Sequence, residues 1–202
     1  MTELRDVDWD GTDISDEVHE DVHFREADLT DAVSKGASFT RCRFTDCRFG
    51  GSTHTATAFA NCHFTSCRFF DATFTDCKLV GSTFDDCTFN ALVISGGDWS
   101  FVAMRGAQLE GAKLTDVRRV DADLTGAKLK DARVRRVDLH GAALHRVDVT
   151  GADLRGSTIT GLDPLASEVR GAILDPDQTI VLARELGFDV DLAPDPADDP
   201  DA

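Results

Sequence analysis

The sequence lacks most of the features by which nucleic-acid-binding, membrane and secreted proteins are recognised. Only 21 of its 202 residues are Lys or Arg, against 37 Asp or Glu, so the net charge is −16. Because affinity for phosphate depends on clustered Lys and Arg side chains, this balance argues against direct nucleic-acid binding. No apolar run approaches the roughly 18 residues that a membrane-spanning helix needs, and no signal peptide is visible. We therefore expect a soluble cytoplasmic protein.

Signals of catalysis and of cofactor binding are also few. The chain contains no G-x-S-x-G motif and no dinucleotide-binding fingerprint. The six cysteines follow the spacing of an internal repeat rather than C-x-x-C pairs, which favours buried free thiols over a metal site. The sequence predicts a protein that is not an enzyme and needs no cofactor.

What the chain does have is a five-residue period. Every fifth residue from Leu4 to Ile159 gives 32 positions, of which 28 are apolar where the composition alone predicts about 13. From Ala27 onward, the residue two places before these central positions is mostly small: Ala, Cys, Ser or Thr, with Val in the second half. A period of five fits neither the 3.6 of a helix nor the 2 of a flat strand. It predicts a coil that turns a corner every five residues, with one large and one small side chain pointing inward.

Four pentapeptides would make a coil of 20 residues, and the aromatic residues fit that register. Phe side chains recur on one face at 24, 44, 64 and 84 and on the next at 49, 69 and 89. Parallel rungs about 4.8 Å apart suit offset stacking of these rings. Ser34 and His54 interrupt one column in neighbouring coils and are expected to lie side by side. Arg119 interrupts another column, and we expect its side chain to reach outward.

These repeats resemble the pentapeptide-repeat family, whose motif is A(D/N)LxG. Segments such as Ala122–Leu129 and Gly151–Gly156 match the motif closely, and the resemblance covers roughly residues 4–174. It implies an all-β solenoid, a right-handed quadrilateral parallel β-helix with a short C-terminal α-helix. We assign residues 1–174 to this solenoid.

A separate module is expected at residues 175–192. Asp175 is a good N-cap, Pro176 suits the first helical position, and Gln178 completes a capping box, while Gly187 suits the C-terminal end. A helix of about 11 residues is marginal alone in water, so it must dock. It can cap the last coil, form a two-fold interface, or do both. Residues 193–202, acidic and Pro-rich, are expected to be disordered.

Resemblance to the MfpA/Qnr branch of the family implies that the C-terminal module both caps and dimerises. The side chains assigned to that dimer interface are Val181, Leu182, Leu186 and Phe188. This branch consists of DNA-mimicking proteins that bind DNA gyrase or topoisomerase IV and reduce fluoroquinolone action. The repeats here contain no interrupting loop, which makes the chain more similar to MfpA than to Qnr members.

Outward-facing carboxylates also recur at 20-residue spacing. Columns of carboxylates on rungs about 4.8 Å apart can imitate a phosphate backbone, which carries one charge per about 3.4 Å of each strand. Asp can equally well be a residue that fits the solvated corners and keeps the rod soluble. The candidate partner-binding residues are Asp46, Asp76, Asp85, Asp86, Asp116 and Asp121.

Charge is unevenly distributed, which favours a patchy rather than a uniform mimic. Residues 1–31 carry −10 and residues 161–202 carry −9, whereas residues 101–160 carry +3. We expect that neutralising Asp85, Asp86 and Asp116 weakens binding of a topoisomerase. A structural or adaptor rod for an unrelated protein partner remains the alternative.

Overall fold

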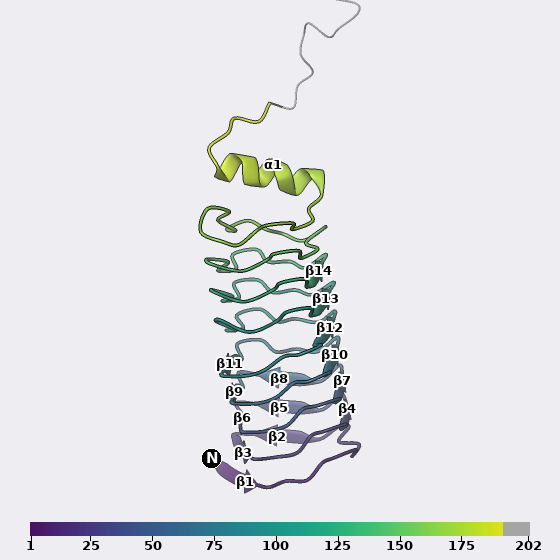
Figure 1. Cartoon of the computed structure of the whole chain (residues 1–202). Coiled ribbons are helices and arrows are strands. Elements are labelled where there is room, and N and C mark those ends of the chain that lie inside the picture. The colour runs from purple at the N-terminus through teal and green to yellow at the C-terminus, as the bar shows by residue number, and fades with distance from the viewer. Residues whose placement is uncertain (192–202) are drawn as a thin grey trace, which may run out of the picture.

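The computed structural model describes residues 1–191 and shows a right-handed, four-sided parallel β-solenoid (Figure 1). The helix α1 (Pro176–Glu185) lies across its C-terminal end. The acidic tail of residues 193–202, for which the sequence predicts disorder, lies outside the described part of the chain. The fold class predicted from the five-residue period and the family motif is confirmed.

Short strands, stacked in parallel, form three of the four sides within residues 1–191. The first sheet consists of β1 (Thr2–Arg5), β3 (Val22–Arg25), β6 (Arg43–Thr45), β9 (His63–Thr65) and β11 (Thr83–Asp85). The second consists of β4 (Val33–Lys35), β7 (Thr53–Thr55), β10 (Thr73–Thr75), β12 (Val93–Ser95), β13 (Lys113–Thr115) and β14 (Arg133–Arg135). The third consists of β2 (Val18–Glu20), β5 (Ser38–Thr40) and β8 (Ala58–Ala60). The fourth side is a ladder of single parallel bridges that runs from Asp8–Asp28 to Asp148–Glu168.

Each rung pairs with the residue 20 positions further on. Leu4 pairs with Phe24, and Phe44 with Phe64, so every central side chain stacks on its counterpart in the next coil. Every fifth residue from Asp6 to Gly161 has a positive φ and forms a corner. Residues with a Cβ rarely adopt this left-handed conformation, and Gly, Asn and Asp tolerate it best. The five-residue period is therefore a period of corners as much as of core side chains.

Stacked aromatic rings fill the N-terminal half of the core. The rings of Phe64 and Phe84 are 4.6 Å apart and 5° from parallel, and those of Phe44 and Phe64 are 4.9 Å apart and 7° from parallel. Rings on adjacent sides meet edge to face, as between Phe64 and Phe69 at 5.7 Å and 71°. Both arrangements suit the quadrupole of the ring. The predicted aromatic columns are confirmed.

The Cys side chains and the Ser82 side chain at the small inward positions donate hydrogen bonds to backbone carbonyls, including those of the preceding coil. All six cysteines are free and buried. The thiol of Cys67 donates to the carbonyls of Phe44 at 3.4 Å and Thr65 at 3.5 Å. Ser82 does the same with its hydroxyl, which donates to Phe59 at 2.6 Å. Cys and Ser thus fill a small space and also satisfy a buried acceptor.

The C-terminal helix begins as the sequence predicts. Asp175 accepts a hydrogen bond from the backbone N–H of Gln178, and the Gln178 side chain accepts one from Asp175, so the capping box is complete. Pro176 is the first residue of the helix. Gly187 follows its end with a φ of +85°.

Candidate partner-binding surface and interior sites

The six acidic residues selected from the sequence are all exposed, and five of them stand at corners. Asp46, Asp76, Asp86, Asp116 and Asp121 have φ between +51° and +57°. Asp85 instead ends strand β11. The recurrence of Asp at these five positions therefore has a backbone cause, because a short polar side chain tolerates the left-handed conformation.

The six residues do not form one continuous surface. Asp46 and Asp86 occupy the corner that comes directly after the sheet β1–β3–β6–β9–β11. Ser66 occupies the same corner in the coil between them. Asp46 lines a shallow depression together with Asp6 and Glu26, and Arg48 and Arg68 line it too.

The other three candidates lie at different corners or carry a partner. Asp76 and Asp116 follow the side of β10 and β13, and Asp121 lies one corner further along the chain. Asp116 forms two hydrogen bonds with Arg136 in the next coil, at 2.6 and 2.8 Å, and this pairing lowers the pKa of the carboxyl. Asp116 is therefore neutralised by a partner within the chain, and its selection as a partner-binding residue stays a prediction.

Pairing between adjacent coils also neutralises acids elsewhere. Asp21 binds Arg41, which stands 20 residues further on, and Asp98 binds Arg118 in the same way at 3.1 Å. The acidic N-terminal coils contain such pairs too, because Glu26 binds Arg5 and Asp28 binds Arg48.

At the C-terminal end, a single helical side chain closes the last coil. Gln178 is buried, and its amide donates to the carbonyls of Leu154 at 2.7 Å and Ser157 at 2.6 Å. The carboxylate of Asp175 accepts from the backbone N–H of Gly156 at 2.8 Å. These bonds satisfy backbone groups that the solenoid would otherwise leave open.

The four predicted dimer residues differ in exposure. Leu182 is half-buried and packs against the core of the solenoid. Val181 is also half-buried, whereas Leu186 and Phe188 are 43% and 65% exposed. The apolar surface that the module offers to another molecule is therefore centred on the last two.

The predicted Ser34–His54 neighbours are part of a buried polar network. The Ser34 hydroxyl lies 2.7 Å from His54 Nδ1 and 2.8 Å from the hydroxyl of Thr57, and His54 Nε2 lies 3.1 Å from Ser52. All four side chains are fully buried. Burial lowers the pKa of His54 to about 3, because desolvation disfavours the charged ring. The network is satisfied and inaccessible, so it is structural.

The buried histidine predicts a pH dependence of stability. His54 takes up a proton in the unfolded chain below pH 6.5 but in the folded protein only near pH 3, so stability falls as the pH is lowered through this window. Between pH 7 and pH 5 this group alone removes about 2 kcal/mol from the free energy of unfolding. From urea titrations at several pH values, we expect His54→Phe to lose this contribution to the pH dependence of the free energy of unfolding. His63→Gln, at an exposed histidine, should keep it; an unchanged slope in His54→Phe would contradict the assignment.

Residues 19–23 spell H-E-D-V-H, which on a helix is a zinc-binding pattern. Here His19 lies in β2 and His23 in β3, on two different sides of the solenoid with a corner at Asp21 between them. His19 stacks on Phe39 at 5.3 Å, and His23 bonds to Thr45 at 3.0 Å. No group of three or more metal-ligating side chains is gathered within residues 1–191.

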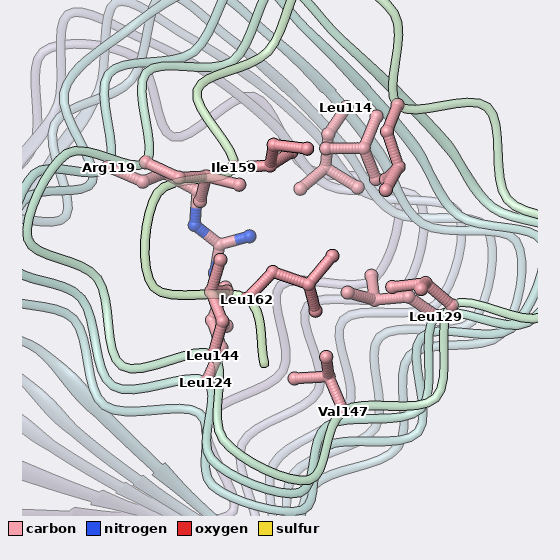
Figure 2. A pocket seen from close by; sticks show the side chains of 12 residues that line it. Leu114, Arg119, Leu124, Leu129, Leu144, Val147, Ile159 and Leu162 are labelled. Carbon is pink, nitrogen blue, oxygen red and sulfur yellow. The ribbon is translucent and has the colours of Figure 1, made fainter. Parts of the chain in front are cut away.

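Arg119 points inward, against the expectation that it reaches solvent. It occupies a central position of the repeat, so its side chain enters the core and is 1% exposed. The residues around it in the C-terminal half are Leu, Val and Ile rather than Phe, and they leave a narrow cavity of about 20 Å³ into which its guanidinium projects (Figure 2). The core of the C-terminal half is therefore not completely filled at this point.

The fold defines a repeat protein whose sides and corners, rather than a deep cleft, are available to partners. Sequence models agree: the pentapeptide repeat region matches residues 37–114, and pentapeptide repeats in eight copies match residues 20–53 and 120–161. The chain belongs to the pentapeptide-repeat family. No curated protein matches it significantly.

Solved structures of QnrB1, described as a plasmid-mediated fluoroquinolone resistance protein, have a similar fold. A trypsin-treated variant matches with a TM-score of 0.71 and 18% identity, over 93% of this chain and 99% of that one. The full-length protein matches with a TM-score of 0.57 and 16% identity, over 92% of this chain and 100% of that one. Within residues 1–191, no helix has the length and apolar character needed to cross a bilayer.

Proposed function

We propose that this protein binds a type II topoisomerase, DNA gyrase foremost, on the surface that the enzyme uses for DNA. Occupying that surface would modulate or inhibit the enzyme and protect it from fluoroquinolones or from a toxin. The observation that carries the proposal is a column of exposed acids, Asp6, Glu26, Asp46 and Asp86, with Asp85 beside the last. Arg5 pairs with Asp6 and Glu26, whereas Asp46, Asp85 and Asp86 form no ion pair within residues 1–191 and therefore contribute most of its free negative charge. The role is non-catalytic, needs no cofactor and belongs to the cytoplasm.

Electrostatics supply the physical reason. The first 31 residues carry −10 on little more than one coil and a half of surface. A topoisomerase grips the DNA backbone with Lys and Arg, which would be attracted to carboxylates stacked at about 4.8 Å. Attraction of this kind raises the association rate and weakens as salt is added. The description of QnrB1 as a fluoroquinolone resistance protein supports the choice of partner.

Neutralising the unpaired acids tests the proposal directly. We expect the combined variant Asp46→Asn, Asp85→Asn and Asp86→Asn to bind immobilised gyrase about tenfold more weakly at low salt. Asn also tolerates positive φ, so the corners at 46 and 86 stay intact. The double variant Asp116→Asn with Arg136→Gln is the matched control, because it removes an acid together with the base that already neutralises it. Equal affinity of the triple variant and the wild type would refute the acidic column as the binding surface.

We further propose that two chains associate through the C-terminal module, with Leu186 and Phe188 at the centre of the interface and Val181 and Leu182 beneath them. Exposed apolar side chains of this size just after a capping helix favour a self-complementary contact. Light scattering should give twice the monomer mass for the wild type and the monomer mass for Leu186→Glu with Phe188→Glu. Leu165→Glu, at an exposed leucine outside the module, should remain dimeric. A monomeric wild type would contradict the proposal.

An adaptor or structural rod for a different protein partner is the second candidate. It is favoured by the corner geometry, which accounts for Asp at most of the candidate positions without any partner. It is also favoured by the ion pairs that neutralise Asp116 and Asp21. If gyrase and topoisomerase IV both fail to bind, this candidate replaces the first.

A further inference from the structure

The axial cavity beside Arg119 has an unusual combination of walls. Eleven of its twelve lining residues are Leu, Val or Ile, and the exception is Arg119. Figure 2 shows the guanidinium projecting into the space that Leu114, Leu129 and Leu162 surround. The cavity exists because aliphatic side chains replace the Phe columns of the N-terminal half, and they are too short to meet at the axis.

Arg119 has hydrogen-bond donors but almost no acceptors. Its Nη2 lies 2.9 Å from the sulfur of Met104, a weak acceptor, and its guanidinium carbon lies 5.9 Å from the ring centroid of Trp99. Among residues 1–191, neither Arg119 Nε nor Trp99 Nε1 has a hydrogen-bond partner, and no carboxylate pairs with this arginine. Buried polar groups are normally satisfied, so two adjacent orphaned donors call for an explanation.

The guanidinium stays charged at neutral pH. Burial lowers the pKa of Arg119 to about 10, which is still well above 7. A buried cation without a counter-charge is strongly destabilising, and the cation–π contact with Trp99 offsets only part of that penalty. The core therefore contains an uncompensated positive charge next to an open volume.

We propose that this cavity binds one small monovalent anion, such as chloride, against the guanidinium of Arg119. The volume of about 20 Å³ has room for a single monatomic ion and is too small for phosphate or any organic acid. A water molecule there would lack the two to four polar partners it needs, because the remaining walls are apolar. A cation is excluded by the charge and by the shortage of acceptors. The anion supplies both the missing counter-charge and an acceptor.

Thermal unfolding in chloride tests the site. At an ionic strength held constant with sodium gluconate, whose anion is too large for the cavity, raising chloride from 1 to 100 mM should raise the Tm of the wild type by about 4 °C. Arg119→Met keeps the length of the side chain and removes the charge, so its Tm should not respond. Arg118→Met is the control, because Arg118 is exposed and pairs with Asp98; this variant should respond as the wild type does.

Anomalous diffraction from wild-type crystals grown in sodium bromide is the second measurement, and it does not require any variant to fold. A bromide peak within hydrogen-bonding distance of the Arg119 guanidinium is the expected result. A cavity without a bromide peak, or a chloride response of equal size in Arg119→Met, would overturn the proposal. Either finding would mean that the cavity contains water or is empty, and that Arg119 has no bound anion.

Discussion

Gly97→Ala is expected to be the most damaging single methyl group that can be added to this protein. Gly97 has a φ of +84°, and a Cβ there would overlap the carbonyl oxygen of Cys77 and lie 2.8 Å from its backbone nitrogen. Two rigid backbones would have to separate, two residues before the buried Trp99. We expect a loss of about 4 kcal/mol or more in the free energy of unfolding, measured by guanidinium titration.

Gly111→Ala measures the backbone-conformation part of this effect without the steric overlap. Gly111 also has a positive φ, +66°, but no atom lies within 4 Å of the position its Cβ would take. The left-handed backbone alone should cost about 1–2 kcal/mol. Losses of equal size in the two variants would show that backbone conformation, not the close approach of adjacent coils, limits position 97.

Phe64→Ala should remove the centre of the aromatic core. The Phe64 ring stacks between those of Phe44 and Phe84 and meets the edge of Phe69. It is 1% exposed, and its neighbours are held by the rung spacing, so they cannot collapse into the void. We expect a loss of about 4 kcal/mol, again in guanidinium titrations.

Phe70→Ala is the matched control for the aromatic core. Phe70 lies only six residues further along the chain, yet it is 63% exposed. Its removal should change the free energy of unfolding by about 0.5 kcal/mol or less. If Phe64→Ala were as mild as Phe70→Ala, stacked rings would not be the main source of stability in this half.

The periodic part of the molecule could be predicted because the sequence pattern, the strand pairing and the core packing all follow the same 20-residue coil. A central side chain such as Phe44 must stack on Phe64 once the coil length is 20 residues, and the pairing of β6 with β9 follows. The C-terminal helix could be located because its capping signals at Asp175 and Gln178 are local. Neither inference required knowledge of distant contacts.

Departures from the period were harder to predict. The side chain of Arg119 was expected to reach solvent, but a central position fixes the direction of Cα–Cβ toward the axis, and the adjacent coils block its way out. The cavity beside it depends on the summed volume of side chains from several coils, which no single repeat reveals. The contacts of Gln178 with Leu154 and Ser157 depend equally on how the helix docks.

The acidic positions show where a pattern has two causes. Asp recurs at 20-residue spacing, and we interpreted the recurrence as a surface for a partner; the positive φ at Asp76 and Asp121 explains it without one. The pairing of Asp116 with Arg136 was available from the sequence, because the two residues are 20 apart, but it was not considered. A column of carboxylates supports a partner-binding role only if the acids that pair with an Arg of a neighbouring coil are not counted as part of it.

The central claim is that this protein acts on a type II topoisomerase, and a DNA gyrase supercoiling assay tests it most directly. Purified protein is added with and without ciprofloxacin, at two salt concentrations. The account predicts inhibition of supercoiling, or protection from the drug, at micromolar protein or below, with the effect weaker at the higher salt. An unaltered reaction under all four conditions, for gyrase and for topoisomerase IV alike, would contradict the account.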